Sequence, residues 1–433
     1  MLSPPGCIMR LTSTTSQLCG GSVMDYDKLK RAVAGEASAI RAITRLQPAD
    51  GPGAKIFPPT YEQGRYCIEQ RWVDGESVTC VLLDSVQSQA NRMETALLDA
   101  RRSGRLSFPD IEVVFPANLD LPFERISVLE APHRIADAIL RDSNLNGTPF
   151  RDSEVGQQFV RATARNARGV LEISPVSLLF GYWDSTGLGT GGLGAKFARL
   201  IASEIVGYYV EVGQRGAVRV DPLGIQRGII LYEKGEFPYW TPSPENAVTD
   251  DKGNPKKVAR RSGDKKEAGR PSVINHGNIL AGIEAGGVSI RYALQNSVIN
   301  FAALRQLYFG DPDPDSEVNQ VARTYLAALA LCALTALWER GYTLRSRCLL
   351  QPESRNVELL PLHPGKPEPI ERLNFEQARK LFDEARDEAI RHGFDVDGKL
   401  IELHPCNELQ DLIRENLQRI NPLLGPEEED AES

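Results

Sequence analysis

The residues whose types and spacing most clearly suggest chemistry form the glycine-rich segment Ser185–Lys196, STGLGTGGLGAK. Its GTGGLG portion satisfies the GxGxxG pattern, in which glycines let the backbone approach the diphosphate of a dinucleotide. An apolar run precedes the segment, a helix is predicted over Ala195–Val206, and Glu211 lies near where a ribose-binding acid belongs. One hypothesis is therefore an oxidoreductase that uses a NAD-type cofactor and the Gly189–Gly194 loop.

The same segment also suits a nucleic acid. Backbone amides of Gly192 and Gly194 at a helix N-terminus can approach a phosphate, with Lys196 and Arg199 adding positive charge. A Walker loop is excluded because no adjacent Gly-Lys-Ser/Thr is present. A Rossmann domain needs further alternating strand–helix units, whereas the surrounding sequence favours hairpins. A flexible glycine loop with solvated basic side chains explains the spacing equally well.

A second set of polar residues lies on a helix predicted over residues 84–103. Gln87, Gln89, Asn91 and Arg92 are mostly neutral donors, which suit phosphate and ribose oxygens. A solvated polar face is the alternative interpretation. Further along, Arg134 can reach a phosphate or pair along its own helix with Asp137, and for Asp137 the structural role is favoured.

The charge of the chain is unevenly distributed. The formal net charge is -8, but residues 250–270 contain eight basic and four acidic side chains, among them Lys256, Lys257, Arg260 and Arg261. The acidic residues of segment 426–433 account for much of the negative total. An acidic chain can therefore present a basic binding surface.

Hydrolytic, redox and metal chemistry find little support in the sequence. The five histidines lie apart, and no HExxH, GxSxG or Cys-His metal spacing occurs. Seven cysteines without a CxxC pair are typical of reduced thiols in a cytoplasmic protein. The apolar run 324–338 is shorter than the roughly 20 residues that cross a bilayer, so it predicts a buried helix. We expect no catalysis, no cofactor, no metal and no membrane.

The periodicity of the remaining chain predicts an α+β fold. An Asp74-Gly75 turn joins two β-rich runs into a hairpin, and the apolar stripe of helix 84–103 packs behind it. Further helices are predicted at 25–46, 131–142, 316–340 and 374–392. Strands are predicted at 65–73, 76–83, 178–183, 208–212, 228–233 and 288–299, with a strand pair within 343–360.

The predicted organisation has five parts. They are a disordered extension 1–24, a core 25–310, a projecting basic insertion 239–272 within that core, a mainly helical region 311–425, and an acidic disordered tail 426–433. Met24 is a candidate for the natural start of the protein.

Four stretches together resemble a known family. They begin at Lys55 (KIFPPTY), Val81 (VLLDSVQSQANRMETALL), Glu130 (EAPHRIADAILRDS) and Ser177 (SLLFGYWDSTG, followed by GGLGAKFARLIASEIVG). In this order they resemble the backbone subunit of type I-G CRISPR Cascade complexes, formerly type I-U. That subunit is the Csb-one type of the Cas-seven family. The similarity extends from about Met24 to about 310, and more loosely into the helical C-terminal part.

The resemblance implies an RRM-like (ferredoxin-like) core sheet with helices on one face, large insertions and a helical C-terminal part. It also implies a non-catalytic protein of antiviral defence, several copies of which line up along the crRNA in a helical filament. Its other implied partners are the target DNA strand, a Cas-five/six-type guide-end subunit, a large subunit and a recruited helicase-nuclease. A protein that serves every guide must avoid reading bases, so its contacts should go to phosphate and 2′-hydroxyl groups.

Two features limit this implication. The chain has no aromatic RNP signature of a sequence-reading RRM. Family members carry a projecting thumb, and insertion 239–272 is a candidate for part of it, although a basic loop can instead contact target DNA or a neighbouring subunit. A structural scaffold without nucleic acid is a third class. The predicted RNA contacts are Gln87, Gln89, Asn91, Arg92, Arg134, Gly192, Gly194, Lys196, Arg199, Lys256, Lys257, Arg260 and Arg261.

Overall fold

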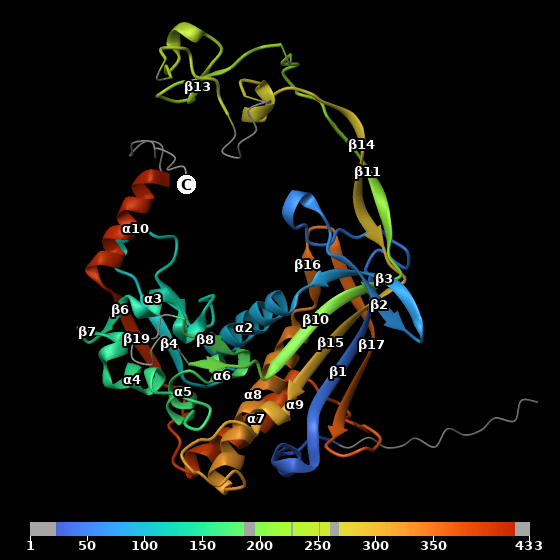
Figure 1. Ribbon diagram of the computed structural model, residues 1–433, viewed down its shortest axis with the longest axis vertical. Helices are drawn as coiled ribbons and strands as arrows, with labels where there is room; N and C mark the ends of the chain where they lie inside the picture. The colour runs from blue at the N-terminus through green and yellow to red at the C-terminus, as the bar shows by residue number, and fades with distance from the viewer. Residues whose placement is uncertain (1–22, 186–194, 227, 251, 260–267, 421–433) are drawn as a thin grey trace, which may run out of the picture.

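A computed structural model of the chain describes residues 23–185, 195–226, 228–250, 252–259 and 268–420 (Figure 1). The fold is mixed α+β. A curved antiparallel sheet carries helices on one face, a smaller second sheet lies beyond these helices, and a long arm projects from one end of the main sheet (Figure 1).

The main sheet is antiparallel in every strand pair that it contains. Seven of its eight strands follow the order β16-β17-β1-β15-β10-β3-β2, and β18 pairs with β17. The bounds are β1 Ala37–Pro48, β2 Ile68–Val73, β3 Glu76–Asp84, β10 Ile201–Tyr208, β15 Tyr292–Asn300, β16 Tyr342–Arg345, β17 Cys348–Pro361 and β18 Glu368–Pro369.

Strand β1 lies at the centre of this sheet and joins segments that are distant in sequence. Ile43 is opposite Asn296 of β15 on one side and Asn356 of β17 on the other. Buried and half-exposed residues alternate along most of β1, as expected where helices cover one face. Because β17 completes the sheet, the region after residue 310 belongs to the same core as the N-terminal part.

Three long helices cover the sheet on one side (Figure 1). They are α2 Val86–Arg102, α8 Glu317–Glu339 and α9 Phe375–Arg391. Every residue of α8 from Val321 to Trp338 is buried. By length and composition α8 could cross a membrane, but its apolar window is entirely enclosed by the protein. The predicted buried helix is therefore confirmed.

The second sheet has the strand order β5-β4-β19-β6-β7. Its strands are β4 Asp110–Val114, β5 Arg125–Ser127, β6 Ser143–Leu145, β7 Thr148–Pro149 and β19 Leu400–Pro405. Short helices and one short strand pair connect the two sheets. They are α3 Ala138–Arg141, α4 Glu154–Val160, α5 Arg168–Ile173, α6 Pro175–Phe180, α7 Phe301–Leu304, β8 Tyr182–Trp183 and β9 Lys196–Phe197, and the last described helix is α10 Asn407–Ile420.

The arm, residues 211–289, is a two-stranded ribbon with an irregular tip (Figure 1). Its strands β11 Glu211–Arg219 and β14 Ile279–Ser289 pair with each other, and the tip contains β12 Tyr232–Glu233 and β13 Trp240–Thr241. The described residues of the predicted insertion 239–272 lie within this tip. Several large apolar side chains are exposed on the tip, including Val220, Leu223 and Phe237.

Several predicted elements are confirmed with small shifts in their bounds. The hairpin β2–β3 turns at Asp74 and Gly75, both of which have the positive φ angles of a tight turn. Helices α2, α8 and α9 and the strand pair β16–β17 also form as predicted. Among the cysteines of the described residues, Cys80, Cys332 and Cys348 are buried, whereas Cys67 is exposed.

Other predicted elements are wrong. The helix predicted over residues 25–46 ends early, because α1 covers only Tyr26–Arg31 and the rest forms a short helical turn and then β1. The segment 195–206 forms β9 and the start of β10 instead of a helix. Pairing of β10 with β15 and β3 makes this segment a strand. Residues 131–142 form a 3-10 turn and α3. Of the predicted strand 178–183, residues 178–180 belong to helix α6 and only Tyr182–Trp183 form a strand, β8.

Candidate nucleic-acid interface

A buried polar layer fixes helix α2 to the sheet. The Gln89 side chain donates from Nε2 to Asp84 Oδ2 (2.5 Å) and accepts at Oε1 from Ser203 Oγ (2.9 Å) and Gln295 Nε2 (2.8 Å). Both Gln89 and Gln295 are only 1% exposed. Gln89 is therefore enclosed and hydrogen-bonded within the protein, and not exposed on the surface of α2 where a contact to RNA was expected.

Arg92 also has a structural role. Its Nε donates to the buried carboxylate of Asp84 (2.9 Å), and its Nη2 donates to the carbonyl oxygen of Leu344 (2.6 Å). These bonds join α2 to strand β16. The Arg92 side chain remains about one-third exposed, at 31%. If Arg92 contacts a ligand, it must do so with a guanidinium that is already hydrogen-bonded to Asp84 and to strand β16.

Two of the predicted residues lie on the exposed side of α2. Gln87 and Asn91 are one helical turn apart and both are exposed. In the orientation that satisfies its hydrogen bonds, the Asn91 amide donates to Glu94 Oε2 and to the Gln87 carbonyl oxygen, each at 3.3 Å. The N-terminal turn of α2 is capped by Ser85, whose hydroxyl accepts from the Ser88 backbone amide (3.2 Å).

Arg134 lies beside the middle of α2 and is almost wholly buried, at 7% exposure. Its Nε donates to Glu94 Oε1 (2.6 Å) and its Nη1 to the carbonyl oxygen of Gly181 (3.0 Å). Burial raises the pKa of Glu94, and the neighbouring Arg134 opposes that rise. The guanidinium of Arg134, predicted to contact RNA, is thus enclosed in this pair and away from the surface. Asp137 instead caps α3 by accepting from the backbone amide of Ile139.

Arg199 is the unpaired cation of this group. It is half-buried and forms no ion pair with a carboxylate in the part of the chain that the structure describes. Burial lowers the pKa of its guanidinium, and the positive charge of Arg134 lowers it further. A partly desolvated cation of this kind gains most from an anion that arrives with a ligand.

The short strand pair β8–β9 carries the next basic side chain. Lys196 is exposed, and its Nζ lies 5.7 Å from the ring centroid of Trp183, which is opposite it in the pair. The Trp183 side chain is 62% exposed. The sequence prediction included Lys196 but missed Trp183, although an aromatic residue just before a glycine-rich segment was a usable signal.

A further basic group lies where the arm leaves the sheet. Lys55 donates to the carbonyl oxygen of Gln214 in β11 (2.6 Å), and the guanidinium of Arg347 stacks 4.0 Å from the ring centroid of Phe57. Gly287 of β14 has a φ of +73°, and a Cβ atom there would lie 2.5 Å from Lys55 Cδ. Lys55 and Arg347 were missed because they are distant in sequence and meet only in the fold.

The remaining predicted contacts are divided between the arm and undescribed segments. In the arm, Lys256 pairs with Glu233 (3.0 Å) and Lys257 is exposed. Gly192, Gly194, Arg260 and Arg261 lie outside the described residues. The structure therefore places Gln87 and Asn91 on the exposed side of α2, Arg199 close enough to Glu94 of α2 to act on its pKa, and Lys196 on the strand pair β8–β9. The described arm lysines lie apart from all of these.

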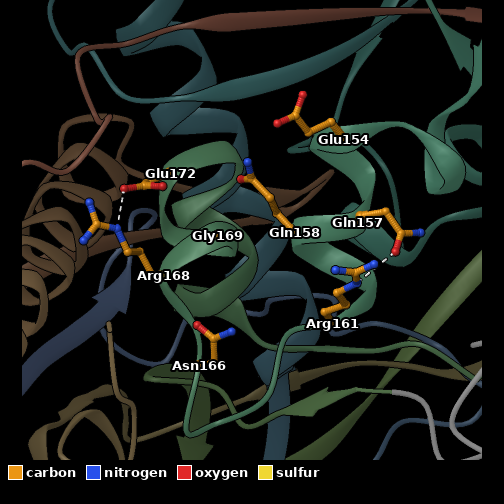
Figure 2. A pocket seen from close by; sticks show the side chains of 8 residues that line it. All are labelled: Glu154, Gln157, Gln158, Arg161, Asn166, Arg168, Gly169 and Glu172. Atoms are coloured by element: carbon orange, nitrogen blue, oxygen red, sulfur yellow. Dashed lines mark hydrogen bonds and ion pairs between the residues drawn. The ribbon is translucent and has the colours of Figure 1, made fainter. Parts of the chain in front are cut away.

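A recess of about 490 Å³ opens between α4 and α5 and contains none of the predicted contacts (Figure 2). Its lining is polar. Arg168 pairs with Glu172 (2.9 Å), and Arg161 donates to the Gln157 side chain (3.1 Å), so both cations are already engaged (Figure 2).

One group of possible metal ligands occurs among the described residues. It consists of Glu317, Glu388 and His392, at the start of α8 and the end of α9. Both carboxylates already pair with cations, Glu317 with Lys30 and Glu388 with Arg391. The group is thus explained as an ion-pair network between the two helices.

The dinucleotide hypothesis fails on the fold. The strands that surround the glycine-rich segment are antiparallel, and no helix follows it at residues 195–206. Glu211 begins the arm strand β11 and does not end a parallel strand beside a cofactor site. A Rossmann site requires parallel strands and a helix whose N-terminus faces the diphosphate.

Comparison with known proteins finds a matching family model and similar solved structures. Residues 40–212 match the family model of CRISPR-associated protein GSU0053. The chain is also similar to the crystal structure of Thermofilum pendens Csc2, with 11% sequence identity and a TM-score of 0.24, over 84% of this chain and 81% of that chain. No curated protein matches the chain. The chain is therefore similar to a CRISPR-associated family over the segment that runs from β1 into β11.

Proposed function

We propose that this chain is a non-catalytic backbone subunit of a CRISPR effector complex and binds the guide RNA by its sugar-phosphate backbone. The observation that carries this proposal is the match of residues 40–212 to a CRISPR-associated family. That segment contains α2, Trp183, Lys196 and Arg199, so the matched part of the chain also carries the exposed amide and basic side chains.

The topology supports an RRM-like core. Four strands have the order β17-β1-β15-β10, all antiparallel. Along the chain, α2 lies between β1 and β10, and α8 lies between β15 and β17. This is the order of elements in a ferredoxin-like β-α-β-β-α-β unit, into which the β2–β3 hairpin is inserted before α2. In the proposed function, the arm serves as the projecting thumb.

The chemistry of the exposed groups fits backbone recognition. Gln87 offers a neutral amide donor, and Lys196 and Arg199 offer cations that no described carboxylate neutralises at ion-pair distance. Such groups contact phosphate and ribose, and these contacts do not depend on the base sequence of the RNA. The Asn91 amide is exposed, but both of its hydrogens are already donated, to Glu94 Oε2 and to the Gln87 carbonyl oxygen. The proposed subunit acts in the cytoplasm in several copies, as part of a type I-G complex with the partners that the resemblance implies.

Nucleic acid that co-purifies with the chain tests this proposal. The full chain, expressed in cells that carry a guide locus, should retain uniform guide RNA, which extraction and sequencing would identify. A dinucleotide in its place would favour the oxidoreductase, and a protein that neither retains nucleic acid nor binds RNA at low ionic strength would contradict the proposal.

The salt dependence of binding tests the residues. The Lys196→Ala/Arg199→Ala variant should reduce the slope of log K against log salt by up to about two, equally for any RNA sequence. The charge-matched control Lys366→Ala/Lys380→Ala removes two exposed lysines from other parts of the surface and should leave the slope unchanged. A loss that depends on RNA sequence would contradict backbone recognition.

A further inference from the structure

The ring of Trp183 is exposed although its immediate surroundings are well packed. Behind it, the rings of Tyr182 and Phe197 stack at 5.0 Å and are both buried. Tyr182 pairs with Phe197 and Trp183 with Lys196, so one face of this strand pair enters the core and the other carries Trp183 and Lys196.

Contacts on both sides hold this strand pair in place. After Trp183, the Asp184 amide donates to the Ala195 carbonyl oxygen (3.0 Å), and the Asp184 carboxylate accepts two hydrogen bonds from Arg151 (2.9 and 3.0 Å). Before it, Gly181 has a φ of +74°, and a Cβ atom there would lie 2.7 Å from the Phe197 carbonyl oxygen. Trp183 is therefore presented by a fixed backbone, which reduces the entropy lost when a ligand stacks on its ring.

The charges around this ring are positive. Arg151 and Arg134 are compensated by Asp184 and Glu94. Lys196, which lies over the ring, has no such carboxylate partner among the described residues, and Arg199 feels only Glu94, which is already paired with Arg134. Proteins that bind single-stranded nucleic acids combine an exposed aromatic ring with uncompensated cations. A base stacks on the ring, and the cation contacts the phosphate.

A protein partner fits these surroundings less well. Protein interfaces place an exposed tryptophan within a wider apolar patch. Trp183 is the single exposed large apolar side chain in the described part of residues 124–211. Its neighbours in the strand pair and at its end, Lys196 and Ser185, are polar and exposed.

We propose that Trp183 is a stacking platform for one unpaired nucleobase of the bound RNA, with Lys196 contacting the adjoining phosphate. This inference rests on the proposed function, since it requires that the chain bind RNA. Stacking accepts any base because every base presents an aromatic face, so the platform is compatible with guides of every sequence.

The test compares Trp183→Ala and Trp183→Phe in the full chain freed of nucleic acid, with a mixed-sequence single-stranded RNA as the probe. Trp183→Ala should weaken binding by about 5- to 150-fold, the range for loss of one stacked base, and Trp183→Phe should retain most of the affinity. The control is Trp72→Ala, which removes a ring that is 78% exposed on the edge strand β2 and should leave binding unchanged. The slope against salt should stay the same in Trp183→Ala and fall by about one in Lys196→Ala.

Two further measurements separate stacking from a structural role. RNA should quench tryptophan emission in the wild-type chain and much less in Trp183→Phe. An otherwise identical RNA of abasic nucleotides should bind the wild type and Trp183→Ala equally, because there is no base to stack. Equal affinities of wild type and Trp183→Ala for normal RNA would refute the proposal that a base stacks on Trp183. An affinity difference that persists with abasic RNA would also refute it. Neither result would contradict the proposed function. Failure of the wild-type chain to bind RNA would instead refute the proposed function.

Discussion

Replacement of Gln89 by leucine distinguishes a structural from an RNA-binding role for the polar face of α2. The Gln89→Leu variant removes three buried hydrogen bonds, one of which goes to the Asp84 carboxylate. A neutral hydrogen bond contributes about 1 kcal/mol and one to a charged group about 1.5–3 kcal/mol, so the free energy of unfolding should fall by roughly 3–5 kcal/mol. Most of this loss reflects polar groups that remain buried without a partner.

Denaturant unfolding monitored by circular dichroism measures this effect. Gln87→Ala is the matched control, because Gln87 lies on the same helix but is exposed, and its free energy of unfolding should change by less than about 0.5 kcal/mol. The folded fraction of Gln89→Leu should bind RNA with the salt slope of the wild type. If Gln89→Leu unfolds at the wild-type denaturant concentration while its RNA affinity falls, the assignment of Gln89 to the core is wrong.

Two other predictions follow from single positions. Gly181→Ala should lower the thermal unfolding midpoint, because the positive φ and the 2.7 Å approach of the Phe197 carbonyl leave no room for a Cβ atom; an unchanged midpoint would show that the backbone there relaxes freely. Burial raises the pKa of Asp110 from its ordinary value to about 7, so the folded protein holds that proton more tightly than the unfolded chain does. The resulting stabilisation is fully present below about pH 4 and is lost as the pH rises through 7. The Asp110→Asn variant should flatten this part of the curve of unfolding free energy against pH. An identical curve in the variant would exclude Asp110 as the source of the pH dependence.

The sequence predicted best those elements whose pattern is local. The β2–β3 hairpin was identified because Asp74-Gly75 favours one turn type, and α2 because its apolar residues repeat at helical spacing. β1 was missed as a strand because its alanines also suit a helix, and β10 because it begins inside segment 195–206, which was predicted as the helix after the glycine-rich segment. Only pairing with distant strands, β15 and β17 for β1, decides between the two.

The candidate site was partly predictable for the same reason. Gln87 and Asn91 face outward as expected, whereas the burial of Gln89 could have been deduced because it lies three residues after Val86 and four before Met93, on the apolar stripe. The burial of Arg134 depends on Glu94 and Gly181, which come from other parts of the chain. Contacts between residues this far apart in the sequence cannot be predicted from a local sequence pattern.

The position of β1 at the centre of the sheet has a consequence for synthesis of the chain. Both of its neighbouring strands, β15 and β17, leave the ribosome long after β1 itself, since they end at Asn300 and Pro361. At 5–20 residues per second, both edges of β1 stay unpaired for roughly 13–50 s, until β15 is made, and one edge stays unpaired for roughly 16–63 s, until β17 is made. Nascent chains that stall before Cys348 would display an open strand edge, so they are expected to associate with one another and to depend on chaperones more than the finished protein does.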